Sequence, residues 1–218
     1  MLISNKKKFI FIHNPKTAGT SLTKVLLPYS DFLSRNQNKP YFYYFNKFVL
    51  SKLIGNIYAK HTPAWRVKKN VPEKWESFYT FGVVRNPYNR SYSYYMYLKN
   101  NKRLNSYVKD ISFRDYIFSI RKQNWIDYQY YYFCDQNKKL IIDKVIKMEE
   151  LDVQFRKLFS DIDLGLGFNI PHLNSTESKT DYFDYYDREM ISEIMMCSLM
   201  ILKFLTTRKF ILSNITLH

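Results

Sequence analysis

Two short stretches of the chain combine residue types that bind phosphate or sulfate groups. The first, Asn14–Ser21, reads NPKTAGTS and is small and polar, with one cation. It follows the apolar run Phe9–Ile12, which is typical of a buried parallel strand, and precedes apolar residues at helical spacing. A loop that turns from a strand into a helix aims several backbone N–H groups at one point, where the helix dipole adds positive charge. The pattern predicts an anion site, and an ordinary strand, turn and helix is the alternative. The candidate residues are Lys16, Thr17, Ala18, Gly19, Thr20 and Ser21.

The second stretch, Phe81–Tyr95, follows another apolar run and contains an arginine and a serine eight residues apart. Arg85 stands at the carboxyl end of the strand predicted over residues 77–84, and Ser93 lies on the following helix. An arginine there presents a planar fork that suits two phosphate oxygens. Arg90 shares a helical face with Ser93, and its alternatives are phosphate contact, a solvated role or a place at the core edge.

His61 is the candidate general base. It stands at the end of a short strand predicted over residues 57–61, within AKHTPAW. Histidine titrates near neutrality and is the commonest proton acceptor in catalysis. The alternative is a histidine that caps the next helix, which we expect Thr62 and Pro63 to open. His13, just before the first stretch, is expected to be packed rather than catalytic.

The first stretch is not a standard Walker loop, because Lys16 precedes the only glycine. No acidic residue follows the second apolar run, which ends instead at Arg85. Metal-dependent nucleotide hydrolysis is therefore disfavoured, and we expect a metal-free transfer with no metal site. A small-molecule kinase is disfavoured on the same grounds.

Strands alternate with helices along the chain, which predicts an α/β protein with a central parallel sheet covered by helices on both faces. Sites in such sheets gather at the carboxyl ends of the strands, where both stretches fall. Further elements are expected as a helix over 41–54, a helix from 87 to about 99 capped by Asn86, a helix over 112–122 capped by Ser112, a strand over 143–148 with a helix from 149 to about 161, a long loop over 165–182 and a terminal helix from 184. We expect one domain over residues 1–218.

Composition narrows the class of partner. The 218 residues carry 34 Lys and Arg against 19 Asp and Glu, a net charge of +15, which favours anionic partners such as nucleic acid, acidic glycan or a phosphorylated nucleotide. The two cysteines, Cys134 and Cys197, support neither a disulfide framework nor a zinc site. No signal peptide or membrane span is visible, so we expect a cytoplasmic protein.

Together the motifs PKTAGTS and VRNPYNRS resemble those of the carbohydrate sulfotransferase family that includes heparan sulfate 2-O-sulfotransferase. The resemblance runs from Phe9 to about Tyr186 and implies a P-loop-like fold of three layers. It implies transfer of a sulfuryl group from 3′-phosphoadenosine 5′-phosphosulfate (PAPS) to a carbohydrate hydroxyl, with His61 as the base. Lys16 and its loop would hold the 5′-phosphosulfate, and Arg85 and Ser93 the 3′-phosphate. A late stretch, HLNSTESK, adds Ser175, Thr176 and Lys179 as cofactor contacts.

The chain departs from that family at its end, from about residue 198. Family members commonly finish in DIEIFNY, whereas this chain reads ILKFLTT over residues 201–207. Codons for ILKFLTT, read one frame over, can encode DIEIFNY, so we expect this tail to be translated out of the ancestral frame. A catalytically degenerate protein that still binds PAPS or its product PAP is therefore one alternative function. A basic nucleic-acid-binding protein is another, although the chain shows no recognised motif of that class.

Overall fold

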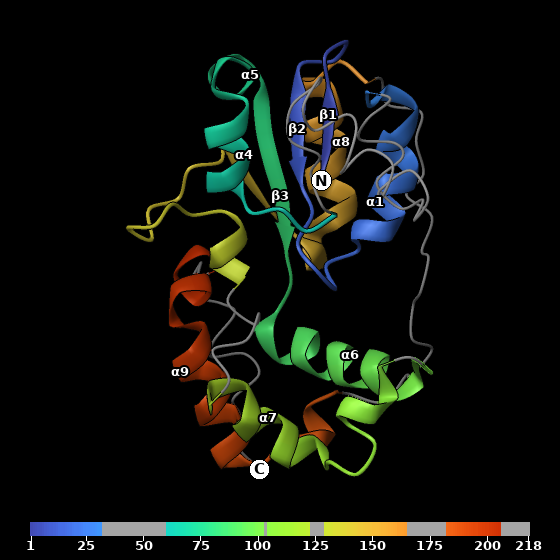
Figure 1. Cartoon of the computed structure of the whole chain (residues 1–218), viewed down its shortest axis with the longest axis vertical. Coiled ribbons are helices and arrows are strands. Elements are labelled where there is room, and N and C mark those ends of the chain that lie inside the picture. Colours follow the sequence, from blue (N-terminus) through green and yellow to red (C-terminus); the bar gives the residue numbers. More distant parts are fainter. Residues whose placement is uncertain (32–59, 103, 123–128, 165–181, 206–218) are drawn as a thin grey trace, which may run out of the picture. The chain divides into compact units, whose positions relative to one another are not determined.

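The computed structural model describes residues 1–31, 60–102, 104–122, 129–164 and 182–205 (Figure 1). These residues divide into two compact units, one from residues 1–84 and 131–174 and the other from residues 85–130 and 175–218. The single domain expected for the whole chain stays a prediction. The described strands are β1 (Leu2–Ser4), β2 (Phe9–Ile12), β3 (Tyr79–Val84) and β4 (Lys144–Lys147). The described helices are α1 (Gly19–Leu26), α4 (Ala64–Asn70), α5 (Pro72–Ser77), α6 (Pro87–Asn100), α7 (Phe113–Lys122), α8 (Leu151–Asp161) and α9 (Arg188–Leu205), with 3₁₀ turns at Leu27–Tyr29, Asn105–Tyr107, Gln129–Tyr132, Met148–Glu150 and Tyr182–Tyr185.

The first unit is built on a four-stranded sheet in the order β1-β2-β3-β4. β2, β3 and β4 are parallel, with Phe11 opposite Phe81 and Val83 opposite Ile146. The predicted α/β class with a central, mostly parallel sheet is thus confirmed. β1 pairs antiparallel with β2 and was not predicted, because three residues give no periodic signal.

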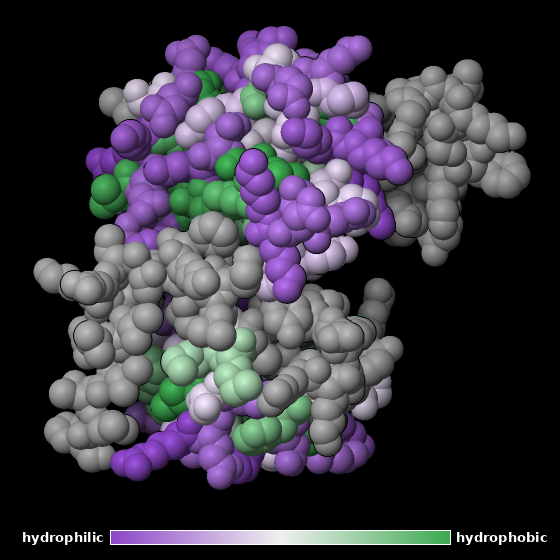
Figure 2. Space-filling view, turned by 90° about the vertical axis from the view of Figure 1, so that its left-hand side faces the viewer, coloured by the Kyte–Doolittle hydropathy of each residue, from purple (hydrophilic) through white to green (hydrophobic). Residues whose placement is uncertain are grey.

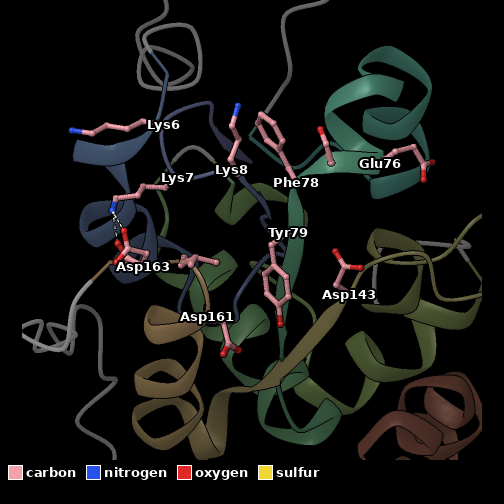
Figure 3. Close-up of a pocket in the computed structure, with 11 residues that line it drawn as sticks. Lys6, Lys7, Lys8, Glu76, Phe78, Tyr79, Asp143, Asp161 and Asp163 are labelled. Carbon is pink, nitrogen blue, oxygen red and sulfur yellow. Dashed lines mark hydrogen bonds and ion pairs between the residues drawn. The ribbon is translucent and has the colours of Figure 1, made fainter.

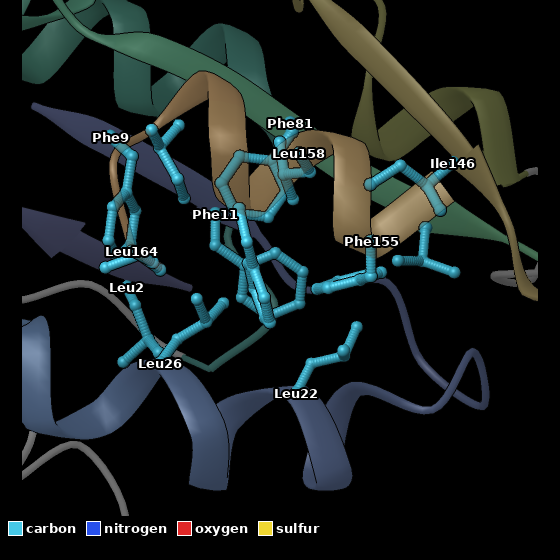
Figure 4. Packing of buried hydrophobic residues seen from close by; sticks show 13 residues of the cluster. Leu2, Phe9, Phe11, Leu22, Leu26, Phe81, Ile146, Phe155, Leu158 and Leu164 are labelled. Atoms are coloured by element: carbon cyan, nitrogen blue, oxygen red, sulfur yellow. The ribbon is translucent and has the colours of Figure 1, made fainter. Parts of the chain in front are cut away.

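The core of this unit lies between the sheet and two helices. Alternate residues of the strands point to one face, where Leu22 of α1 and Leu158 of α8 pack against Phe11 and Phe81 (Figure 4). Phe11 and Phe81 have ring centroids 5.4 Å apart, and both side chains are buried. Burial of such side chains contributes about 1.5–3 kcal/mol each, which makes this layer the main anchor of the sheet.

Other side chains cover the opposite face of the sheet. Residue 82 points away from the layer of α1 and α8, and a Cβ atom at Gly82 would overlap the ring of Phe133. Figure 1 shows α4 and α5 across the sheet from α1 and α8, and Ala64 and Val67 of α4 are fully buried. The first unit therefore has the three layers that the sequence predicts.

The second unit is helical. Tyr95 and Leu98 of α6, Ile117 of α7 and Met190 and Ile194 of α9 form its buried cluster. The ring of Tyr186 joins this cluster, and its hydroxyl donates to the backbone oxygen of Tyr88 at 2.8 Å. Packing of α6, α7 and α9 thus stabilises the helix that follows β3 in the chain.

Two of the predicted helix caps are present. The side chain of Asn86 accepts hydrogen bonds from the backbone N–H groups of Tyr88 (3.0 Å) and Asn89 (3.3 Å), so α6 begins at Pro87 as expected. Ser112 Oγ accepts from the N–H of Asp115 at 3.1 Å at the start of α7.

Four boundary predictions are corrected by the structure. α4 begins at Ala64 with Pro63 as its N-cap residue and no side-chain cap, so Thr62 does not cap it. Lys60 and His61 lie in a turn and not in a strand, because the chain there passes directly into the cap of α4. β4 is shorter than predicted, and α9 begins at Arg188 because a 3₁₀ turn precedes it. The predicted helix 41–54, residues 57–59, the loop 165–181 and most of the atypical tail lie outside the described residues.

The surface in one view is mainly hydrophilic. On the face shown in Figure 2, hydrophilic side chains cover most of the coloured area, with smaller hydrophobic patches between them. In the part of the chain that the structure describes, no helix has the length and apolar character to cross a membrane.

Candidate functional site

The predicted phosphate loop has a backbone shape suited to anions. Between β2 and α1, Lys16 and Ala18 adopt positive φ angles of 63° and 56°. Such angles are uncommon for residues other than glycine and persist where the surrounding structure fixes them. Left-handed residues that alternate with others turn successive N–H groups toward one concavity, the arrangement found in phosphate-binding nests.

Two buried side chains anchor this loop. Asn14 Nδ2 donates to the backbone oxygen of Val83 at 3.1 Å, which ties the loop to the end of β3. Thr17 Oγ1 donates to the backbone oxygen of Asn14 at 3.0 Å. Because both side chains are buried, the loop is held by the sheet rather than by solvent-exposed contacts.

The start of α1 adds positive potential at the same place. Its N-cap residue is Ala18, which offers no side-chain oxygen, and its first turn has no acidic residue. The N–H of Leu22 is bonded to the backbone oxygen of Ala18, so the N–H groups of Gly19, Thr20 and Ser21 precede the intrahelical ladder. An anion at this end is favoured by these donors and by the helix dipole.

Gly19 is required by close packing. A Cβ atom at this position would overlap the imidazole ring of His13, which is 3% exposed. The ring of His13 therefore lies directly against the first residue of α1. Its packing agrees with the expected structural role.

The structure places His61 beside His13, the residue that precedes this loop. His61 Nδ1 lies 3.1 Å from the backbone oxygen of His13, the residue before the loop. A carbonyl only accepts, so Nδ1 carries the proton and the lone pair lies on Nε2. The ring is exposed, and it does not cap α4, whose N-cap residue is Pro63. This tautomer is the one that a general base needs.

The surroundings of His13 strongly disfavour protonation of its imidazole. Burial lowers the pKa of His13 far below its usual value, and the nearby Met1 amine, His61 and Lys60 lower it further. Burial also lowers the pKa of Lys60, and it lowers that of the Met1 amine to about 4. His13 is therefore neutral at pH 7, and its imidazole does not add charge to the site.

In the second unit, Arg85 is fixed by a residue that the sequence did not point to. The Arg85 N–H donates to Gln129 Oε1 at 2.9 Å, and Gln129 Nε2 donates to the Arg85 oxygen at 2.7 Å. Arg85 Nη2 donates to Asn89 Oδ1 at 2.5 Å. Ser93 follows Asn89 by one helical turn, so these two residues lie along one face of α6, and Arg85 reaches Asn89 from just before the helix.

Gln129 and Asn89 carry no sequence signal of their own, since each acts through contacts that only the fold creates. Arg90 is 1% exposed, which contradicts the solvated alternative for that residue. Ser175, Thr176 and Lys179 lie outside the described residues.

A separate pocket of about 650 Å³ opens at the amino ends of the parallel strands, opposite the ends that lead to the phosphate loop and to Arg85 (Figure 3). It is lined by residues at the amino ends of the strands and at the end of α8, including Lys8, Tyr79, Asp143 and Asp161. Lys7 and Asp163 form an ion pair of 2.9 Å at its rim. The phosphate loop follows the carboxyl end of β2, so this pocket is not part of the candidate site.

No protein-family model matches the chain, and no curated protein sequence does. Among solved structures, it is similar to the crystal structure of mouse sulfotransferase SULT7A1 complexed with PAP. The identity is 15%, the TM-score is 0.44, and the match covers 93% of this chain and 68% of the mouse chain. Similarity at this level does not by itself assign an activity.

Proposed function

We propose that this protein is a PAPS-dependent sulfotransferase that transfers a sulfuryl group to a hydroxyl of a carbohydrate, in line and without a metal ion, with His61 as general base. One observation carries the proposal: His61 Nδ1 is bonded to the backbone of the residue that opens the phosphate loop. A base and an anion-binding loop are thus adjacent, which is the minimum that transfer of a sulfuryl group requires.

The residues present fit the donor. The N–H groups of Thr17 to Ser21 and the ammonium of Lys16 suit a 5′-phosphosulfate, because the loop backbone is already bent toward one point. The guanidinium of Arg85 and the hydroxyl of Ser93, with Asn89 between them, suit a 3′-phosphate. Ser175 and Thr176 remain proposed cofactor contacts from the resemblance.

When bound, PAPS supplies the sulfuryl group and a 5′-phosphate oxygen that becomes negative as its bond to sulfur breaks. His61 Nε2 takes the proton of the acceptor hydroxyl as the new bond from oxygen to sulfur forms. Lys16 and the loop N–H groups stabilise the charge on the departing oxygen. The imidazolium then returns its proton to solvent, since the ring is exposed.

A carbohydrate acceptor and a cytoplasmic location are proposed from the sequence. The net charge of +15 favours an anionic sugar, because a basic surface raises the local concentration of such an acceptor.

The test compares thermal stabilisation of the protein by PAP, by ADP with Mg²⁺ and by single-stranded DNA. A ligand that binds only the folded state raises the melting temperature according to its affinity. The proposal predicts the largest shift with PAP and sulfate transfer from PAPS to a sugar acceptor. PAP stabilisation without transfer to any sugar would support a degenerate PAP-binding protein, and a preference for DNA or ADP would contradict the proposal.

A further inference from the structure

The imidazole of His13 sits where β2, the start of α1 and the turn that carries His61 meet. Its ring stacks on Phe11, with centroids 5.7 Å apart and an interplanar angle of 27°. It meets the ring of His61 edge to face, with centroids 4.6 Å apart and an angle of 68°. Its third side is closed by Gly19, where no side chain fits.

These contacts leave the His13 ring little freedom to turn. Phe11 and Gly19 both belong to the layer between the sheet and α1, and neither is exposed. A ring held between two buried neighbours cannot shift freely, because close-packed interiors do not deform continuously. The His13 ring therefore presents a fixed surface toward His61. The exposed ring of His61 contacts that surface edge to face.

His13 also acts through its backbone. Its carbonyl accepts from His61 Nδ1 at 3.1 Å, which fixes the tautomer of His61, while its ring constrains the plane of His61. The titratable groups near the His13 ring are the Met1 amine, Lys60 and His61, and none of them is acidic. Burial opposes a proton on His13, and a positive charge on any of these groups opposes it further, so His13 does not compete with His61 for the proton of the acceptor.

We propose that His13 is the positioning residue of the base: its ring and carbonyl together hold His61 in one orientation and one tautomer beside the phosphate loop. The catalytic consequence rests on the proposed sulfotransferase function. The structural part, one tautomer held by one neighbour, does not depend on it.

The structural part is tested by ¹⁵N NMR of the histidine side chains in the full-length protein, with His61→Gln used to assign the His61 signals. In the wild type, His61 should show a protonated Nδ1 and an unprotonated Nε2 at a pH where the ring is neutral. In His13→Ala the backbone carbonyl remains, but without the packed ring His61 is free to turn away from it, so the two tautomers should mix. Ile117→Ala, a change in the buried cluster of the second unit, serves as the control for lost stability and should keep the wild-type pattern. An unchanged tautomer in His13→Ala would overturn the proposal.

The catalytic part is tested by kinetics. His13→Ala should lower kcat about 10-fold or more and leave PAP affinity within about threefold, since a misplaced base affects the transition state more than binding. Gly19→Ala should lower kcat by pushing the His13 ring, and it should add little further loss in the His13→Ala background, where the ring is absent. Additive losses, or a fall in PAP affinity equal to the fall in kcat, would contradict a positioning role. If the wild type transfers no sulfate, the proposed function fails, and the NMR result still decides the positioning role.

Discussion

Among single residues, His61 is the proposed acceptor of the proton in sulfate transfer. Replacing it with alanine should reduce sulfate transfer by about 10²–10⁴, the usual contribution of a general base. PAP affinity should stay close to that of the wild type, because the loop proposed to bind the nucleotide is held by hydrogen bonds of Asn14 and Thr17. The measurement pairs kcat with calorimetric PAP binding, and normal turnover by His61→Ala would refute the assignment.

Gln129 is the second residue on which the site depends. Its amide holds both the N–H and the oxygen of Arg85, and it is 1% exposed. Gln129→Ala removes the side-chain partner of both part-buried backbone groups, so it should lower the free energy of unfolding by about 1–3 kcal/mol. It should also weaken the preference for PAP over adenosine 5′-phosphate, because Arg85 is no longer fixed.

Gln154→Ala is the matched control for this change. Gln154 accepts a hydrogen bond from the N–H of Lys147 at 3.2 Å, at a site more open to solvent than Gln129 and in the other unit. Urea unfolding and PAP titration of both variants check the prediction. Equal effects of the two changes would show that the two hydrogen bonds from Gln129 to the Arg85 backbone have no special role.

Among the helices and strands, the start of α6 depends on its N-cap residue, Asn86. Asn86 is buried and accepts from two N–H groups of the first turn. Asn86→Ala should cost about 1 kcal/mol of stability, within the range of 0.5–2 kcal/mol for N-cap losses. Asn86→Asp, which keeps the acceptor, should recover most of that loss in urea unfolding. A loss unchanged by the aspartate would mean that the cap is not the cause.

The sequence predicted those elements whose signals are local. The strand over 9–12 and the helix that follows it were marked by an apolar run and a small polar loop, and Asn86 and Ser112 were marked by cap chemistry. β1 was missed because three residues acquire their pairing only from β2. A strand ending at His61 was wrong, since a β-rich run does not show where the chain turns into a cap.

The residues of the candidate site were named from local sequence signals. The residues that hold them in place could not be found in that way. Arg85 directly follows an apolar run and Lys16 lies in the small polar loop after another, which a sequence reveals. Gln129 meets Arg85 from a position 44 residues away, and the His13 ring meets Gly19 only because the chain folds back through the loop. Such contacts depend on tertiary packing, for which residue types and spacing carry no local mark.

At the scale of the whole molecule, stability should depend on pH through two buried groups. The pKa of His13 and that of the Met1 amine are both lowered on folding, so the unfolded chain binds more protons than the folded one below about pH 6.5. Stability therefore falls as pH falls, by about 1.4 kcal/mol per pH unit for each such group.

Replacing His13 isolates its share of this slope. Between pH 6.5 and 5, His13→Gln should show roughly half the wild-type decline in the free energy of unfolding, because only the Met1 amine then contributes. Asp163 and Asp187, whose pKa values are lowered, contribute at lower pH and do not obscure the comparison. Urea unfolding at several pH values measures the slopes, and equal slopes in the two proteins would contradict the burial of a neutral His13.

The proposed function requires that one bisphosphorylated nucleotide bind to both predicted motifs. Calorimetric titration with PAP of the wild type, Lys16→Ala, Arg85→Ala and the double variant tests it most directly. We expect one PAP per chain and a loss of affinity of about 10-fold or more in each single variant. Arg85→Ala should bind PAP and adenosine 5′-phosphate with the same affinity. Wild-type PAP affinity in either single variant, or no preference for the 3′-phosphate in the wild type, would contradict it.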